Sequence, residues 1–392
     1  MGTGVCPPRV KRRRGPCDRM LSTVAARTFR APRLYLQGPG VIEQASEIVI
    51  ALGRVPVLVT DAEVAGILGR RLSQILRPLA PDIEPLVLTG ELSGSAVDGL
   101  LERARGADVV VAAGGGRVLD AGKAVARRLG AALLAVPTIA SSDAATSRAA
   151  VLHEADEEVV EHPAWNPDAV LVDTAIIAAA PARFLRCGIG DALATKFELE
   201  ACAAAGGESP NGGTTTIAAA ALADACYATV RRFGRAALDA VEAGVPDEAL
   251  EAVVEAALLL SGLGFEGGGL SIAHSLAIAL ARTPGLDRGA HGEQVAYGLL
   301  VQLALDDRDE RLLDLAGFCA EVGLPRTLET VGAPGAGEVE MRSLALQTMS
   351  APWVANHPLT PGCDDLVTAL RKVERLGHAP TPIESPTTRA VA

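Results

Sequence analysis

The sequence predicts an α/β half with a parallel sheet, followed by an all-α half. Between residues 32 and 173, short apolar runs alternate with segments of helical spacing, which is the pattern of repeated βα units. From Thr174 onward, Ala-rich helical segments follow one another with only Gly and Pro breaks between them. We therefore expect an α/β domain over residues 29–173 and an all-α domain over residues 174–377.

Composition and charge exclude several classes of protein. The chain has 392 residues and only 3% aromatic residues, so it can bury a large core made mainly of Ala, Val and Leu. Its formal net charge of −11 argues against nucleic acid as a partner, and no apolar stretch suits a membrane span. The seven cysteines, an odd number, show no CxxC spacing, which indicates a reduced, cytoplasmic protein.

Both ends of the chain differ from the body. Residues 1–28 place Arg and Lys among Gly and Pro, without the apolar segment of a secretion signal. We expect a disordered extension here, or an upstream start with Met20 as the true initiator; a nuclear or nucleic-acid-binding tail is the alternative. Residues 378–392, rich in Pro and Thr, are expected to form a loose tail.

The elements of the first half can be assigned in order. Strands are predicted at 33–36, 55–60, 84–89, 109–113, 133–136 and 169–173, and helices at 41–52, 64–76, 96–105 and from 118. A hairpin with residues 154–156 at its tip is expected before the last strand. Because right-handed crossovers make such a sheet parallel, ligands are expected at the carboxyl ends of its strands.

The stretch from Asp108 to Lys123, DVVVAAGGGRVLDAGK, lies at the centre of this half. Its β-branched run suits a strand buried on both faces, and three glycines follow before a helical pattern begins. Glycines at such a turn let the backbone approach a ligand, and the first N–H groups of a helix attract phosphate. A tight βα turn without a ligand is the alternative, since the triplet is not a GxGxxG fingerprint.

Two carboxylates are expected near the carboxyl ends of the predicted strands. Asp61 follows the second strand, where it can bind ribose hydroxyls and repel a 2′-phosphate, or cap the next helix. Asp143 lies in the polar loop PTIASSDAATS, residues 137–147, beside the glycine turn. It can contact a cofactor or substrate there, or form an Asx-turn.

In the second half, helices are predicted at 178–185, 191–205, 214–232, 248–262 and 270–281, with further helices from 294 to 376. Breaks are expected at 206–207, 246, 264–269 and 284–285. Three residues stand out as candidate metal ligands: Asp191 opening a helix after Gly-Ile-Gly, His274 in mid-helix, and His291 beginning a helix. A helix cap, a buried core histidine and a first-turn residue are the respective alternatives.

Taken together, these segments resemble the glycerol dehydrogenases, members of the iron-containing alcohol dehydrogenase superfamily. The resemblance runs from about Arg30 to about Leu376. It rests on QGPG from Gln37, GGGRVLDAGKA from Gly114, PTIASSDAATS from Pro137, NPDAVLVDT from Asn166, APARFL from Ala180, GIGDALAT from Gly188, LLSGLGFEGGGL from Leu259 and HGEQVAYGLLVQL from His291.

The resemblance implies an NAD-binding Rossmann-like domain and a metal-binding helical domain, the architecture of dehydroquinate synthase. It implies zinc ligands at Asp191, His274 and His291, which with Asp143 form the catalytic and substrate-binding set. For the cofactor it implies contacts from Asp61, Gly115, Gly116, Arg117, Asp120, Thr138, Ser141, Ser147, Ala149 and His153. Iron-type relatives carry a histidine where this chain has Thr195, and this difference favours zinc with an open position.

Four positions depart from the family pattern: Arg117 replaces Lys, Ala145 replaces Pro, Lys196 replaces Trp, and His153 replaces Tyr. We expect the Lys196 change to alter which polyol is preferred.

The implied reaction is oxidation of glycerol or a related vicinal diol to dihydroxyacetone or its analogue by hydride transfer to NAD. Glycerol-1-phosphate or other diol dehydrogenases and a sugar-phosphate cyclase of the dehydroquinate synthase type are the alternatives, and a non-catalytic binding protein is opposed by the intact triad. The resemblance also implies a homo-oligomer, with dimers assembling into octamers.

Overall fold

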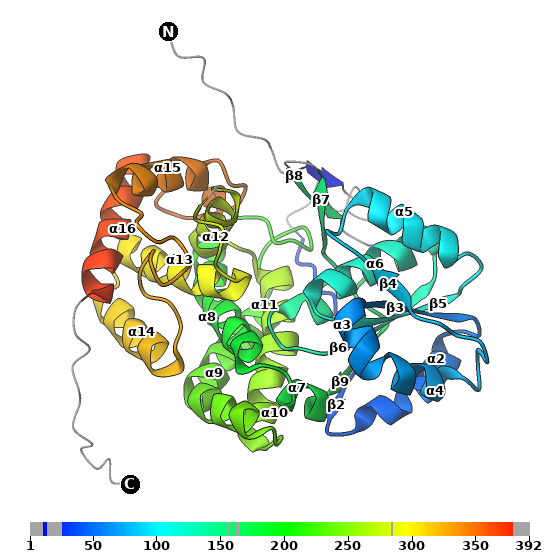
Figure 1. The fold of residues 1–392 in the computed structure, drawn as a ribbon. Coiled ribbons are helices and arrows are strands. Elements are labelled where there is room, and N and C mark those ends of the chain that lie inside the picture. The colour runs from blue at the N-terminus through cyan, green and yellow to red at the C-terminus, as the bar shows by residue number, and fades with distance from the viewer. Residues whose placement is uncertain (1–10, 14–25, 155–156, 162–164, 284, 379–392) are drawn as a thin grey trace.

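The computed structural model describes residues 11–13, 26–154, 157–161, 165–283 and 285–378. Within them, a parallel sheet flanked by helices forms one half of the molecule and a cluster of helices forms the other (Figure 1). The predicted fold class is therefore confirmed. Most of the expected terminal extension and all but the first residue of the expected tail lie outside the described residues, so those expectations stay predictions.

The main sheet has six parallel strands in the order β2-β9-β6-β5-β3-β4. Their bounds are β2 Leu34–Gly38, β3 Pro56–Asp61, β4 Leu86–Leu88, β5 Val109–Gly114, β6 Ala132–Pro137 and β9 Ala169–Asp173. Every residue of β5 is buried, as its β-branched run predicted. Val109, Val111 and Ala113 pack on one face of the sheet, and Val110 and Ala112 on the other. The central strand thus joins two separate cores.

Helices cover both faces of this sheet. They are η1 Val41–Gln44, α2 Ala45–Leu52, α3 Ala62–Val64, the π-helical turn η2 Ala65–Gly69, α4 Arg70–Leu76, α5 Gly94–Arg103 and α6 Gly116–Leu129. The α2 and α4 helices share one core with Val109, Val111 and Ala113 of β5. The α5 and α6 helices pack in the other core, which continues into the helical half. The second core therefore connects the two halves directly.

A small second sheet follows the polar loop, which contains η3 Asp143–Ala145. Strands β7 Ala150–Glu154 and β8 Glu157–Glu161 are antiparallel, which confirms the predicted hairpin. Strand β1, Lys11–Arg13, pairs in parallel with β8, although no element was expected in this part of the chain. Near the same end, the carbonyl of Ala26 accepts a hydrogen bond from Thr214 N at 2.9 Å, so this segment contacts the helical half.

Helices make up the rest of the described chain. They are α7 Thr174–Ala178, α8 Ala182–Ala204, α9 Ile217–Ala243, α10 Glu248–Glu255, the π-helical turn η4 Ala256–Leu260, α11 Ser261–Gly268, α12 Ile272–Arg282, α13 His291–Leu305, α14 Asp309–Val322, α15 Glu338–Met349, η5 Val354–Asn356 and α16 Cys363–Gly377. No described helix is both long enough and apolar enough to cross a membrane.

At two glycine clusters, the structure lacks most of the helix break that the sequence predicted. The turn expected at Gly188–Gly190 is absent, since α8 runs through it without interruption. The break expected at 264–269 reduces to Gly269 alone, whose φ of 117° ends α11. In both places, close packing rather than a turn explains the glycines. A Cβ on Gly188 would lie 2.1 Å from the Ala140 carbonyl oxygen, and one on Gly268 would lie 2.1 Å from the Leu199 side chain.

Candidate active site

The glycine turn between β5 and α6 forms the floor of a cavity of about 520 Å³. Gly115 precedes the first residue of α6 in an extended conformation, and no side chain caps this helix start among the described residues. Its first N–H groups are therefore available to an anion. A Cβ on Gly115 would come within 2.9 Å of Ile139, so a side chain would crowd the floor of the cavity.

The same cavity brings together several residues predicted to bind the cofactor. Asp61, Gly115, Gly116, Arg117 and Thr138 all line it, with apolar walls from Ile67, Ile176 and Phe184. Asp61 also caps α3, because its Oδ1 accepts a hydrogen bond from Val64 N at 2.8 Å. The capping role and the cavity position therefore coexist in one carboxylate.

Asp120, Ser147 and Ala149 do not belong to this cavity wall among the described residues. Instead they surround the buried ammonium of Lys123, which lies 2.9 Å from Asp120 Oδ1, 3.4 Å from Ser147 Oγ and 2.7 Å from the Ala149 carbonyl oxygen. Burial raises the pKa of Asp120, although Lys123 opposes this effect. These contacts fasten α6 to the strand that follows the polar loop.

Two other predicted cofactor residues lie beyond the cavity wall. Ser141 is half-buried in the polar loop. His153 has an exposed side chain on β7, and its backbone N–H donates to the Leu92 carbonyl at 2.7 Å.

Asp191, His274 and His291 meet in space, and their nearest ligand atoms all lie within 4.8 Å of one another. Asp191 Oδ1 is 3.3 Å from His274 Nε2 and 3.6 Å from His291 Nε2. His291 begins α13, as predicted. The other two positions are corrected: Asp191 lies in the third turn of the continuous α8, and His274 lies in the first turn of α12 rather than in mid-helix.

Close packing of α8 allows this meeting. A Cβ on Gly190, next to Asp191, would lie 2.3 Å from the carbonyl oxygen of Gly292, next to His291. A Cβ on Gly292 would lie 1.9 Å from the Cys187 carbonyl oxygen. Only glycine at these positions lets α8 and α13 come close enough for their metal-ligand candidates to converge.

The carboxylate of Glu198 orients the ring of His274. Glu198 is fully buried and pairs through Oε2 with His274 Nδ1. Since a carboxylate only accepts, Nδ1 carries a proton, and in the neutral ring that metal binding requires, Nε2 directs its lone pair toward Asp191 Oδ1. That oxygen is buried and receives no hydrogen bond from the described residues. Two facing acceptors need a cation between them, so the residues fit a metal ion.

The ionisable groups influence one another strongly here. Burial opposes ionisation of Asp191, but the His274 and His291 rings outweigh burial and lower its pKa. Burial disfavours the charged form of His274, yet Glu198 and Asp191 raise its pKa well above the ordinary value. Both shifts have the direction expected where positive charge lies between carboxylates.

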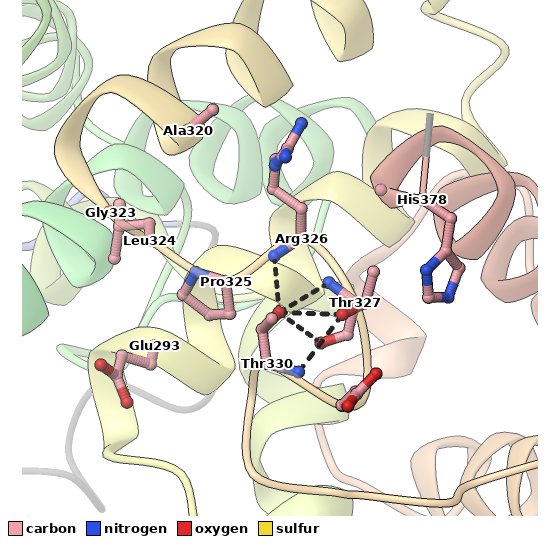
Figure 2. A pocket seen from close by; sticks show the side chains of 11 residues that line it. Glu293, Ala320, Gly323, Leu324, Pro325, Arg326, Thr327, Thr330 and His378 are labelled. Carbon is pink, nitrogen blue, oxygen red and sulfur yellow. Dashed lines mark hydrogen bonds between the residues drawn. The ribbon is translucent and has the colours of Figure 1, made fainter. Parts of the chain in front are cut away.

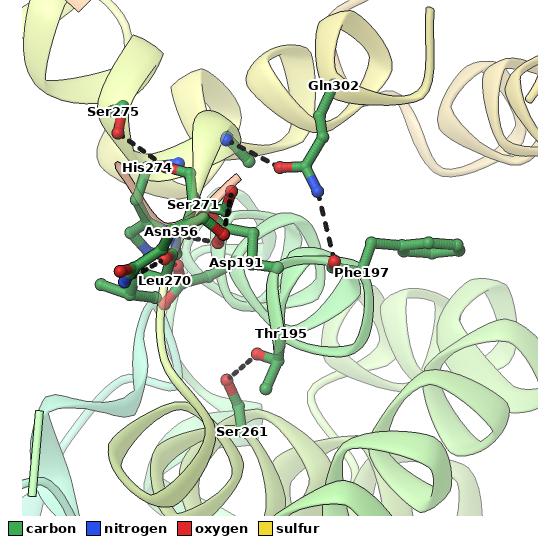
Figure 3. A network of polar contacts seen from close by, with 12 residues as sticks. Asp191, Thr195, Phe197, Ser261, Leu270, Ser271, His274, Ser275, Gln302 and Asn356 are labelled. Atoms are coloured by element: carbon green, nitrogen blue, oxygen red, sulfur yellow. Dashed lines mark hydrogen bonds and ion pairs between the residues drawn. The ribbon is translucent and has the colours of Figure 1, made fainter. Parts of the chain in front are cut away.

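Asp143 borders the same site from the polar loop. Its Oδ2 accepts a hydrogen bond from Ser261 Oγ at 3.1 Å. Figure 3 shows the next contact, in which Ser261 Oγ lies 2.9 Å from Thr195 Oγ1. Burial and the neighbouring charge of Asp191 raise the pKa of Asp143 well above its ordinary value. Thr195 therefore contacts Ser261, which in turn holds Asp143.

Sequence reasoning missed three residues of this site: Glu198, Ser261 and Trp353. Trp353 lies edge-on to the His274 ring, with centroids 6.3 Å apart. Glu198 follows Asp191 by two helical turns on α8, and this spacing could have placed both on one face of the helix. By contrast, Lys196 forms ion pairs with Glu200 and Asp224, so its charge is compensated on another face of α8.

A separate cavity of about 490 Å³ opens beside Glu293, two residues after His291 (Figure 2). Its wall is a loop in which Thr330 Oγ1 accepts hydrogen bonds from Arg326 N at 3.2 Å and Thr327 N at 3.1 Å. Among the described residues, no member of the Asp191, His274 and His291 triad lines it. This cavity is therefore distinct from the candidate metal site.

Comparison with known proteins identifies relatives of the chain. The profile of the iron-containing alcohol dehydrogenases matches residues 37–181. The chain is 38% identical to a glycerol dehydrogenase of Thermotoga maritima, over 88% of this chain and 96% of that protein. It is 40% identical to a glycolaldehyde reductase of Halobacterium salinarum, over 81% and 88%. The crystal structure of a Schizosaccharomyces pombe glycerol dehydrogenase superimposes with a TM-score of 0.86 at 33% identity, covering 91% of this chain and 92% of that one.

Proposed function

The chain belongs to the iron-containing alcohol dehydrogenase family, and we propose that it is an NAD- and zinc-dependent dehydrogenase of glycerol or a related vicinal diol. Its relatives are oxidoreductases that act on alcohol donors, and several of them are glycerol dehydrogenases. With glycerol the proposed product is dihydroxyacetone. The observation that carries the proposal is the convergence of Asp191, His274 and His291 beside Asp143.

The donor set supports zinc as the metal. Two imidazoles and one carboxylate would hold the ion, the number of protein ligands in catalytic zinc sites that keep one position open. Thr195 forms a hydrogen bond with Ser261, and as a threonine it offers no imidazole as a fourth ligand. A bound zinc ion supplies Lewis-acid activation of a substrate hydroxyl, which lowers the pKa of that hydroxyl.

The residues of the chain would orient both reactants. Asp143, held through Oδ2 by Ser261, keeps Oδ1 for a hydroxyl of the polyol. The glycine turn at Gly115 would receive the cofactor pyrophosphate, and Asp61 would accept hydrogen bonds from a ribose. Glu198 holds the Nδ1 proton of His274, so that proton does not compete for the ligand position at Nε2.

A second candidate function is reduction of a small hydroxyaldehyde at the same site. The 40% identity to a glycolaldehyde reductase favours it, and hydride transfer is reversible at one active site. The phosphate-using alternatives need cations beside the metal. In the structure, His274 pairs with the carboxylates of Glu198 and Asp191, and His291 pairs with Asp191.

A substrate panel tests the proposal. NADH formation would be followed with glycerol, 1,2-propanediol, 2,3-butanediol and glycerol-1-phosphate, and NADH consumption with glycolaldehyde and dihydroxyacetone. We expect the highest kcat/KM among the alcohols for glycerol or 1,2-propanediol. A clear preference for glycerol-1-phosphate would replace the proposal with the phosphate-using alternative. Size-exclusion chromatography of the same preparation would test the proposed homo-oligomer.

A further inference from the structure

The start of helix α12 has an unusual arrangement of hydrogen-bond acceptors. Its N-cap residue, Ser271, does not cap the helix with its own side chain; its hydroxyl donates to the Asn356 carbonyl at 3.4 Å. The first N–H groups of α12 are instead bound by side chains from two other helices (Figure 3). Glu198 on α8 accepts from Ser271 N at 2.8 Å and His274 N at 2.9 Å, and Gln302 on α13 accepts from Ala273 N at 3.1 Å.

Glu198 has a second function that Gln302 lacks. One of its oxygens, Oε1, takes both backbone N–H groups, and the other, Oε2, takes the ring Nδ1 of His274. Gln302 contacts the backbone of Ala273 and the Phe197 carbonyl, but no ring of the triad. The two fully buried side chains thus share the task of holding the helix start, and only Glu198 also selects the tautomer of His274.

We propose that Glu198 is a positioning residue that sets metal affinity, by anchoring α12 and fixing His274 as an Nε2 ligand. This inference rests on the proposed metal site. Because Asp191 and Glu198 lie on the same helix, α8 supplies one ligand and orients a second. A carboxylate is required, since two backbone donors and one ring donor converge on it and only a group with two acceptor atoms satisfies all three.

The isosteric amide cannot perform both functions at once. In Glu198→Gln, the single amide oxygen can serve either the two backbone N–H groups or the ring. If it serves the backbone, the NH₂ group faces Nδ1, and the proton of the neutral ring must move to Nε2, where it blocks the ligand position. If it serves the ring, two buried N–H groups lose their acceptor and α12 loosens. Either arrangement weakens metal binding.

The test measures zinc binding itself, by competition with a chromophoric chelator, in the full-length protein. Glu198→Gln should raise the zinc dissociation constant by about 10- to 100-fold, the range typical for partners of metal-bound histidines. The absorption spectrum of the cobalt(II)-substituted protein should also change. Gln302→Met is the matched control, because it removes a buried acceptor from the same helix start without touching the ring; its zinc affinity should stay within about three-fold of the parent.

Each outcome decides the inference. An unchanged zinc affinity in Glu198→Gln would overturn it, and so would an equal loss in Gln302→Met, which would attribute the effect to the helix start alone. If Glu198→Gln does not fold, Glu198→Asp replaces it: the charge is kept but the side chain is shorter, and zinc binding should again weaken while Gln302→Met keeps it. A parent protein that binds no zinc would instead refute the proposed metal and function.

Discussion

The two sides of the candidate site differ in the chemical groups that form them, backbone on one side and ionisable side chains on the other. The proposed cofactor side is mainly backbone, formed by the contiguous turn from Gly114 to Val118 at the end of a fully buried strand. The metal side consists of charged or ionisable side chains on three helices, α8, α12 and α13, oriented by the buried carboxylate of Glu198. A backbone turn tolerates changes of side chain elsewhere, whereas a set of interacting ionisable groups depends on every member.

This difference predicts that the two sides can be damaged separately. Loss of a metal ligand should abolish chemistry and leave cofactor binding intact, while changes near Asp61 should alter cofactor choice and leave the metal in place. The variants below test that separation, from the largest expected effect to the smallest.

The largest effect is expected for His274→Ala. Without this ligand the charge stabilisation at the reacting hydroxyl is lost, which is worth several kcal/mol, so kcat should fall by about a thousand-fold or more. Zinc content should fall with it, while the NAD dissociation constant stays within about two-fold. Steady-state kinetics, metal analysis and NAD titration measure these three quantities. His378→Ala is the control, since it removes a histidine with an exposed side chain at the end of α16.

A packing variant should have the next largest effect. Gly188→Ala places a methyl group 2.1 Å from the Ala140 carbonyl oxygen, so the polar loop or α8 must move, and we expect a loss of about 1–3 kcal/mol in the free energy of unfolding. Gly99→Ala in α5, where nothing lies within 4 Å of the new methyl group, should stabilise by about 0.5–1 kcal/mol. Denaturant unfolding measures both. Equal effects would show that the Gly188 contact does not control packing.

Asp143→Asn should reduce kcat/KM for glycerol by about ten-fold or more. The amide keeps the size of the side chain but replaces one carboxyl oxygen with an NH₂ group, so Ser261 and a polyol hydroxyl no longer each have an oxygen acceptor. Binding of NAD should be almost unchanged, because Asp143 does not line the cavity at the glycine turn. A comparable loss of NAD affinity would identify Asp143 as a residue that only shapes the loop.

The smallest effect concerns the choice of cofactor. The parent should prefer NAD over NADP, since a 2′-phosphate would approach the Asp61 carboxylate. Asp61→Asn keeps an N-cap for α3 but removes the charge, so the ratio of kcat/KM for NAD over NADP should fall by about five-fold, or ~1 kcal/mol. A parent that prefers NADP would show that Asp61 does not select the cofactor.

The same contrast explains what the sequence could predict. The proposed cofactor turn is a local motif, so the strand at Val109 and the glycines after it were assigned correctly, as was the start of α13 at His291. Helix α6 begins at Gly116, two residues before the predicted start at Val118. Hydrophobic patterning also identified the order of strands along the chain. These features depend on neighbours in sequence, which periodicity and turn residues report directly.

The errors occurred where distant segments pack together. Gly188 and Gly190 were interpreted as a turn, but they let α8 pass close to Ala140 and Gly292, which no local pattern reveals. The role of Glu198 depends on His274, which lies on another helix. The acceptors around Lys123, Asp120 among them, likewise become visible only once α6 packs on the polar loop, and the cofactor contact of Asp120 stays a prediction.

The most direct test of the account measures NAD binding and glycerol oxidation in the same chelated preparation. After removal of metal, NAD should bind with unchanged affinity, glycerol oxidation should fall to background, and added zinc should restore it. That result would establish two separable sides, a backbone site for the cofactor and a metal site for the chemistry. Glycerol oxidation at the parental rate in the metal-free protein would contradict the account.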